Sequence, residues 1–146
     1  MILTSKSYED TKKIGYELAR KLDTGSHTSR FIALRGEMGV GKTAFTSGFA
    51  SYFGISGVKS PTYTVVNEYV GDKRIFHFDM YRIADGDDLY SIGYDEYIES
   101  DGYSVCEWSE NIEDFIPEDA VFVTIERVPE DTSARKITID IADGDI

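Results

Sequence analysis

Apolar residues along the chain recur with two different periods, and the changes between them mark the expected elements. A helical period, with apolar positions three or four residues apart, runs from Ser7 to just before Gly25 and returns over residues 44–52, ending near Gly54. Between these segments, residues 31–34 are continuously apolar, which is typical of a buried parallel strand. The start of the chain therefore predicts a helix, a strand and a second helix.

The next part of the chain favours β-structure. Residues 60–69 are dense in β-branched and aromatic side chains, and residues 74–79 form a second such run. Because the turn-forming pair Gly71-Asp72 lies between them, the two runs predict a hairpin.

Acidic and apolar segments alternate after this hairpin. Residues 84–100 are expected to be helical in pieces, with a break at Gly93, and residues 103–107 to form a short buried strand. Two further runs, residues 121–125 and 137–141, predict an antiparallel pair that finishes one side of the sheet. The whole pattern predicts an α/β sandwich around a mixed central sheet, parallel in its core and antiparallel at its margins.

Length and composition indicate one compact unit. A chain of 146 residues with 41% hydrophobic content can bury about two thirds of its unfolded surface, so we expect a single domain over residues 1–146. No stretch approaches the roughly 20 apolar residues that span a bilayer, and no apolar signal-peptide core follows Met1, so we expect a cytoplasmic protein with no membrane partner. The single cysteine, Cys106, agrees with a reducing compartment and is expected to be a small buried hydrophobe.

The formal net charge of −12 disfavours direct binding to nucleic acid, because the summed field repels polyanions at long range. The acidic residues are either a solvated surface or a face for a basic partner protein. A nucleotide, itself an anion, would need a local positive pocket.

Such a pocket is predicted by the segment Gly36-Glu37-Met38-Gly39-Val40-Gly41-Lys42-Thr43, which satisfies G-x-x-x-x-G-K-[ST]. In this loop the glycines free backbone N–H groups to point at phosphate oxygens, the lysine reaches the β and γ phosphates, and the final hydroxyl binds Mg²⁺. The expected strand before it and helix after it are the context that the motif requires, and the helix N-terminus adds partial positive charge.

Two carboxylates are candidates for the chemistry. Asp79 and Glu107 each end an expected strand, and ligands collect outside the carboxyl ends of strands in open α/β sheets. Either one could ligate Mg²⁺ or orient the attacking water, and spacing does not say which. The competing interpretations are a turn role for Asp79 and a surface ion pair for Glu107.

The segment Ser60-Pro61-Thr62-Tyr63-Thr64 has two interpretations. It is a switch that senses the γ-phosphate through a threonine hydroxyl, or an ordinary strand entry. Trp108 is expected in core packing, or at the nucleotide or a partner. His77, within an apolar run, is expected to be a satisfied sheet histidine rather than a catalytic base.

Taken together, these segments resemble the TsaE (YjeE) family of small bacterial P-loop proteins. The resemblance covers nearly the whole chain and rests on the phosphate loop, residues 60–64, His77-Phe78-Asp79-Met80-Tyr81-Arg82 and Glu107-Trp108, in that order. It implies a P-loop NTPase-like fold and a weak ATPase that works with the TsaB and TsaD proteins in making N6-threonylcarbamoyladenosine at position 37 of tRNA. The family is thought to bind the TsaB–TsaD assembly, so contact with tRNA would be indirect.

The resemblance also implies roles for individual residues, with ATP and Mg²⁺ as cofactors. It places Thr43, Glu107 and Asp79 at the metal or in the catalytic network. The implied nucleotide contacts are Glu37, Met38, Gly39, Val40, Gly41, Lys42, Thr43, Thr62, Thr64, Trp108 and Thr11. Family members commonly carry a Gly-Arg pair before the last strand, where this chain has Thr132-Ser133.

Two other functions use the same loop. A small P-loop kinase would need a lid bearing arginines, and the arginines of this chain are scattered. A nucleotide-sensing module, in which hydrolysis is incidental, would use the same residues as an ATPase. A GTPase would need Asn-Lys-x-Asp, which the chain does not contain.

Overall fold

The computed structural model describes residues 1–37, 39–61 and 65–141. The strands in this part are β1 (Ile2–Ser5), β2 (Phe31–Arg35), β3 (Val66–Val70), β4 (Arg74–Asp79), β5 (Tyr103–Glu107), β6 (Val121–Val128) and β7 (Asp131–Ile141). The helices are α1 (Tyr8–Thr24), α2 (Lys42–Tyr52), α3 (Gly86–Ser91), α4 (Tyr94–Glu99) and the 3-10 helix η1 (Ser109–Phe115).

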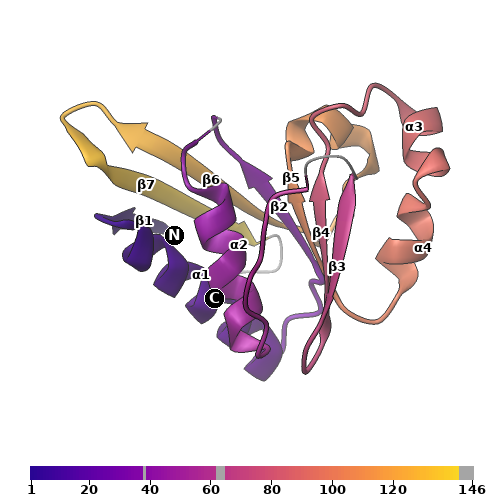
Figure 1. Ribbon diagram of the computed structural model, residues 1–146, viewed down its shortest axis with the longest axis horizontal. Coiled ribbons are helices and arrows are strands. Elements are labelled where there is room, and N and C mark those ends of the chain that lie inside the picture. The colour runs from indigo at the N-terminus through magenta and orange to yellow at the C-terminus, as the bar shows by residue number, and fades with distance from the viewer. Residues whose placement is uncertain (38, 62–64, 142–146) are drawn as a thin grey trace.

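All of the strands belong to one mixed sheet with the order β1-β7-β6-β2-β5-β4-β3 (Figure 1). The central strands β6, β2, β5 and β4 run parallel, while β3 joins one side and β7 and β1 the other side in antiparallel pairing. The sheet therefore has the parallel core and antiparallel margins that the sequence predicts.

Helix boundaries follow the capping residues. Ser7 caps α1, where its side chain accepts a hydrogen bond from the backbone N–H of Asp10 at 3.0 Å, and Gly25 ends the helix. Gly93, in a left-handed conformation, separates α3 from α4. These breaks confirm the helical segments expected before Gly25 and on either side of Gly93.

Two expectations about the strands are wrong. The antiparallel pair β6 and β7 does not finish the sheet, because β1 pairs with β7 beyond it and forms the edge. A strand of four residues has too short a pattern to be recognised in sequence. The strand expected over residues 60–69 does not include Ser60 and Pro61, and β3 is described only from Val66. Pro61 has no N–H to donate, and the Ser60 side chain bonds Thr43 of α2. Residues 62–64 of the expected strand lie outside the described residues.

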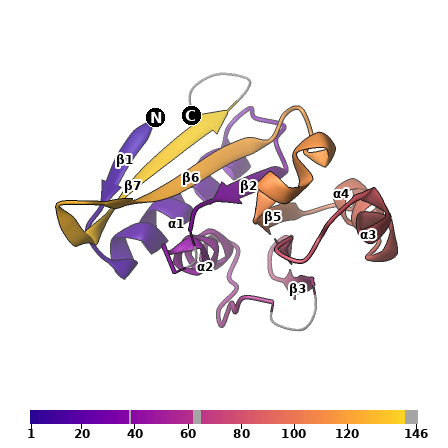
Figure 2. The same cartoon turned by 90° about the horizontal axis from the view of Figure 1, so that it is seen from above.

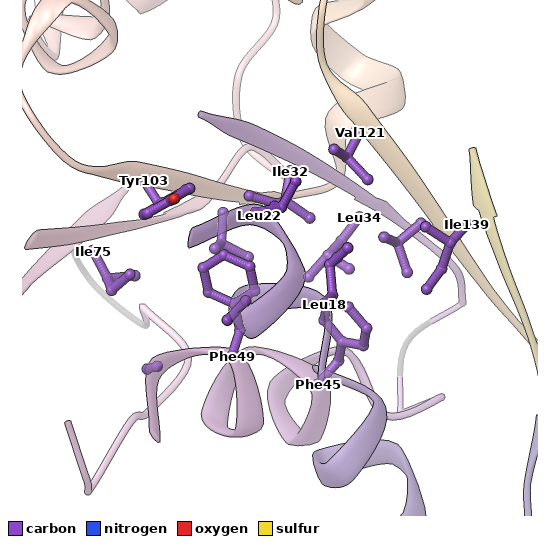
Figure 3. Packing of buried hydrophobic residues seen from close by; sticks show 14 of the residues in the cluster. Leu18, Leu22, Ile32, Leu34, Phe45, Phe49, Ile75, Tyr103, Val121 and Ile139 are labelled. Carbon is purple, nitrogen blue, oxygen red and sulfur yellow. The ribbon is translucent and has the colours of Figure 1, made fainter. Parts of the chain in front are cut away.

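Helices lie on both faces of the sheet, and on one face α3 and α4 lie only near its β4–β5 end (Figure 2). Helices α1 and α2 cover one face, where Phe45 and Phe49 point from α2 toward Ile32 and Leu34 of β2 (Figure 3). On the other face, α3, α4 and η1 contribute to a second cluster around Phe78. Among the described helices, none is long and apolar enough to cross a membrane.

Close contact between α1 and α2 brings the start of α1 to the loop before α2. A Cβ atom added to Gly48 of α2 would lie 1.8 Å from the carbonyl oxygen of Lys12, and one added to Gly15 of α1 would lie 2.2 Å from that of Phe45. Each glycine thus lets the backbone of the other helix approach. As a result Thr11, near the start of α1, lies beside Gly41.

This contact predicts that Gly48→Ala destabilises the protein, although alanine is the better helix former by about 1 kcal/mol. The added methyl group cannot be accommodated without separating the helices, and overpacking of this kind costs about 1–3 kcal/mol. We expect a lower free energy of unfolding in urea denaturation. The control is Ser47→Ala, at the half-buried neighbouring position of α2, where a change below about 0.5 kcal/mol is expected. Equal stability of Gly48→Ala and the unmodified chain would contradict the close approach.

Candidate functional site

A pocket of about 400 Å³ opens where β4 and β5 end and α2 begins. It brings together segments that are far apart in the sequence, as expected at the carboxyl ends of parallel strands. The lining residues are Tyr8, Gly39, Gly41, Lys42, Thr43, Ala44, Ser60, Asp79, Glu107 and Trp108.

The register of β4 and β5 positions the two carboxylates. Asp79 lies directly opposite Glu107 in the parallel pair. Since side chains alternate along a strand, and Phe78 and Cys106 point into the cluster under α3 and α4, the two acids point to the face that α2 covers. Both sequence candidates therefore line the same pocket.

The phosphate loop has the backbone that its glycines permit. Gly36 has a φ of 152° and passes so close to β6 that an added Cβ would lie 2.6 Å from the Ile125 carbonyl oxygen. Gly41 is left-handed, with a φ of 118°, and starts α2. The first turn of α2 carries no acidic residue, so its free N–H groups give this end of the pocket a positive potential.

Lys42 supplies the positive charge of the pocket. It is only 5% exposed, and its Nζ donates a hydrogen bond to the Gly36 carbonyl oxygen at 2.8 Å. The same Nζ lies 4.2 Å from the centre of the Trp108 ring, a cation–π contact. The ammonium is thus held at the pocket wall by neutral groups, and within the described ranges it has no carboxylate partner that would compete with an anion.

Trp108 forms the rim of the pocket rather than part of the deep core. It is the one non-glycine residue among those described with a positive φ, 57°, which bends the chain sharply after β5. Its ring packs against exposed Tyr81 at 5.0 Å. The next residue, Ser109, anchors the bend by donating to the Leu34 carbonyl oxygen at 3.1 Å.

Oxygen atoms suited to Mg²⁺ line the first pocket. Thr43, whose hydroxyl lies 2.6 Å from that of Ser60, lines the pocket with Asp79 and Glu107. Within the described residues, no group of three or more His, Cys, Asp or Glu side chains could hold a metal by itself. This donor set fits Mg²⁺, which proteins usually bind through one or two carboxylates together with phosphate oxygens and water.

Besides lining the pocket, Glu107 contacts His77 on its buried side. Its Oε2 lies 2.5 Å from Nε2 of His77, and both side chains are almost completely buried. The histidine is therefore hydrogen-bonded within the sheet through Nε2, whereas its buried Nδ1 has no partner among the described residues, so the predicted satisfied histidine is found at one ring nitrogen only.

A second pocket, of about 180 Å³, adjoins the first across the phosphate loop. Thr11 lines it, and the Thr11 hydroxyl lies 2.7 Å from that of Ser5. Arg135 of β7 also lines it and donates from Nε to the Val40 carbonyl oxygen at 2.9 Å. The described residues that line it are Ser7, Tyr8, Thr11, Gly39, Val40, Gly41, Ala44, Ser133 and Arg135.

Some predicted residues lie elsewhere, and some lining residues were not predicted. The Glu37 side chain is 79% exposed and faces Arg127 at 3.8 Å, outside both pockets. Met38, Thr62 and Thr64 lie outside the described residues. Sequence reasoning missed Tyr8, Ser133 and Arg135, because they reach the pockets only through the packing of α1 and the β6–β7 hairpin beside the loop.

Cys106 lies behind the site on the other face of β5. Burial, and then the negative charges of Glu107 and Asp79, raise the pKa of its thiol well above the usual value. The thiol therefore stays protonated at neutral pH, and the prediction of a small buried hydrophobe is confirmed.

Comparison with known proteins finds relatives of this chain by sequence. Residues 5–137 match the family model of threonylcarbamoyl adenosine biosynthesis protein TsaE. The tRNA threonylcarbamoyladenosine biosynthesis protein TsaE of Haemophilus influenzae is 42% identical over 104 residues, which cover 68% of this chain and 66%, just under two thirds, of that protein. The protein of the same name from Treponema pallidum is 35% identical over 140 residues, 95% of this chain and 99% of the relative.

A solved structure agrees with these sequence matches. The crystal structure of Bacillus subtilis YdiB superposes with a TM-score of 0.79 at 29% sequence identity, covering 97% of this chain and 84% of that one. The family match and the fold thus extend over most of the chain, including the loop, Asp79 and Glu107. The chain belongs to the TsaE family, which takes part in the biosynthesis of threonylcarbamoyladenosine in tRNA.

Proposed function

We propose that the chain binds ATP with Mg²⁺ in the two adjoining pockets and hydrolyses it slowly, in the cytoplasm, as a component of N6-threonylcarbamoyladenosine synthesis at position 37 of tRNA. TsaB and TsaD are the proposed partners. The observation that carries this proposal is the meeting of Lys42, Thr43, Asp79 and Glu107 around one pocket at the start of α2.

The phosphate end of the nucleotide fits the first pocket. The free N–H groups of the loop and of the first turn of α2 would bind the phosphate oxygens. Lys42 would meet the β and γ phosphates in exchange for its contact with Gly36. Because a buried ammonium gains more from an anion than from a carbonyl oxygen, this exchange favours binding.

Thr43 and one of the two carboxylates would hold Mg²⁺, and the other carboxylate would orient water. Bound Mg²⁺ neutralises the charge that develops on the transferred phosphoryl group. In hydrolysis, the water oxygen forms a bond to the γ-phosphorus, the bond from that phosphorus to ADP breaks, and a carboxylate accepts the water proton. The pairing of Asp79 with Glu107 across β4 and β5 supports these proposed roles.

The second pocket is the proposed site of the nucleoside end. This pocket shares Tyr8, Gly39, Gly41 and Ala44 with the first, so one extended ligand could occupy both. Thr11 and Arg135 would then lie near the base or the ribose. Family members commonly carry a Gly-Arg pair where this chain has Thr132-Ser133. In this chain, Arg135 would make the nucleotide contact from the β6–β7 hairpin instead.

The charge distribution supports an indirect role at tRNA. Residues 83–126 contain fourteen Asp and Glu residues and no Lys or Arg. Eight of these acids lie in α3, α4 and η1, on the sheet face away from α1 and α2, whereas Glu107 is buried in the phosphate pocket. Such a surface repels a polyanion and favours a basic protein, so tRNA is expected to be reached through partner proteins.

The composition of the first pocket supports stimulation by partners. Among the residues that line it in the described part of the chain, none is an arginine. Phosphoryl-transfer sites commonly use an arginine to stabilise the transition state, and it can come from a partner in trans. We therefore propose that the isolated chain is a weak ATPase.

A nucleotide-sensing module is the second candidate. The observation in its favour is the contact of Lys42 with Trp108 and of Trp108 with exposed Tyr81, which links the phosphate pocket to the molecular surface. In this function, nucleotide binding and release would change the partner surface, and hydrolysis would be incidental.

The phosphate pocket predicts that Lys42→Ala weakens ATP binding. Loss of a charge-assisted contact costs about 1.5–3 kcal/mol, or about 10- to 100-fold in Kd. Titration calorimetry with ATP and Mg²⁺ measures the change. Lys136→Ala removes the same charge from an exposed position of β7 and is expected to leave Kd unchanged. Retained affinity in Lys42→Ala would reject the phosphate-loop assignment.

Glu107→Ala separates the ATPase from the sensing module. For an ATPase that drives its partners, we expect ATP binding to persist while both hydrolysis and tRNA modification with TsaB and TsaD fall, by roughly 100-fold or more for a lost general base. Turnover and modification are measured side by side, with and without the partners. Full tRNA modification by Glu107→Ala without hydrolysis would favour the sensing module. The expected stimulation would be contradicted if hydrolysis by the unmodified chain does not rise when TsaB–TsaD is added.

A further inference from the structure

His77 is a polar residue at the centre of an otherwise apolar strand. It is 0% exposed and lies between buried Phe76 and Phe78. Burial of an imidazole costs free energy unless it is hydrogen-bonded, and a Phe or Val would suit the strand better. The position therefore requires an explanation beyond packing.

Among the described residues, the one hydrogen bond of its side chain is to Glu107. In the parallel pair, His77 lies opposite Val105, so it is a diagonal neighbour of Glu107 on the sheet face that α2 covers. Nε2 of His77 is 2.5 Å from Oε2 of Glu107. Glu107 lines the phosphate pocket whereas His77 does not, so the imidazole contacts the carboxylate from behind.

The other ring nitrogen indicates which tautomer is present. Nδ1 is buried and has no hydrogen-bond partner within the described part of the chain. A protonated Nδ1 would be a buried donor without an acceptor, whereas a bare lone pair at Nδ1 costs less. The neutral ring with its proton on Nε2 fits both sides, and this proton is donated to Glu107.

We infer that His77 is a positioning residue that fixes the Glu107 carboxylate for its work at the phosphate pocket. The hydrogen bond engages Oε2 and leaves Oε1 for Mg²⁺ or for the attacking water. A carboxylate on a flexible glutamate side chain would otherwise lose more rotamer freedom when it binds. The inference rests on the proposed function, because it gives Glu107 an orientation for the Mg²⁺–ATP chemistry proposed above.

The test compares variants that keep or remove the donor. Phenylalanine in His77→Phe has a similar shape but no N–H, whereas the side-chain amide in His77→Gln can place an N–H near the position of Nε2. The Mg²⁺ concentration that half-saturates binding of a non-hydrolysable ATP analogue is measured by calorimetry, together with kcat and KM for ATP. We expect His77→Phe to raise the half-saturating Mg²⁺ concentration and to lower kcat, each by roughly 10- to 100-fold.

Three further results distinguish positioning from a merely structural role. His77→Phe should bind the analogue without Mg²⁺ as tightly as the unmodified chain, and His77→Gln should recover most of the Mg²⁺ dependence. Phe76→Leu, on the same strand but packed against Tyr97 on the opposite face, should lower stability without changing the Mg²⁺ dependence. An unchanged Mg²⁺ dependence and kcat in His77→Phe would overturn the inference.

A measurement without nucleotide tests the contact independently. In ¹⁵N-edited NMR spectra of the free chain, the Nε2 proton of His77 should give a downfield signal that exchanges slowly with water and is lost in Glu107→Ala. Absence of this signal from the unmodified chain overturns the inference whatever the ATPase does. Failure of the unmodified chain to bind the ATP analogue would reject the proposed function instead. If His77→Phe does not fold, the inference is tested by the Mg²⁺ dependence of His77→Gln and by the Nε2 proton signal of the unmodified chain.

Discussion

The parallel pairing of β4 with β5 is the constraint on which the site depends. It sets Asp79 opposite Glu107 and His77 diagonal to Glu107, all on the face covered by α2. Because side chains alternate with a period of two, a slip of one residue in either strand would move its carboxylate into the apolar cluster on the other face. The apolar neighbours Phe78 and Cys106 thus fix the register, because a slipped strand would bury a carboxylate in their place in the apolar cluster. Burying an unpaired charge there would cost much free energy. Core packing and site geometry are consequences of the same alternation.

The second half of the site depends on the helices that cover this face. The glycine contacts of α1 with α2 bring the start of α1 beside Gly41, and Arg135 reaches the loop from β7. The phosphate loop is therefore enclosed by β6, α1 and β7 as well as by its own glycines. Its lysine is held by a carbonyl oxygen and an aromatic ring, and these contacts keep the ammonium near the pocket without neutralising it.

Sequence reasoning was strongest where one local pattern determines the structure. Helix α1 was predicted from the cap at Ser7, the break between α3 and α4 from Gly93, and strand β2 from the apolar run before the phosphate loop. The meeting of Asp79 and Glu107 was predicted from their positions at the ends of strands. Sequence reasoning failed for β1, whose four residues are a strand only because β7 offers a partner. It failed also for Ser60 and Pro61, where β-propensity was outweighed by the missing N–H of proline and the contact of Ser60 with Thr43. Tyr8 and Arg135 carry no local signal, because their places at the pockets depend on tertiary packing. Glu37 occupies a variable position of the motif, so the motif alone does not direct its side chain inward.

The uneven placement of charge also has a consequence for how the molecule meets others in solution. Outside residues 83–126 the chain carries thirteen acidic and fifteen basic residues and is nearly balanced, so its excess negative charge belongs to one part of the molecule. An uneven distribution of charge of this kind gives a direction to the electric field around the molecule. In the field of a strongly charged assembly the molecule would rotate before it made contact, and its approach would be oriented even though its net charge alone predicts only repulsion from RNA.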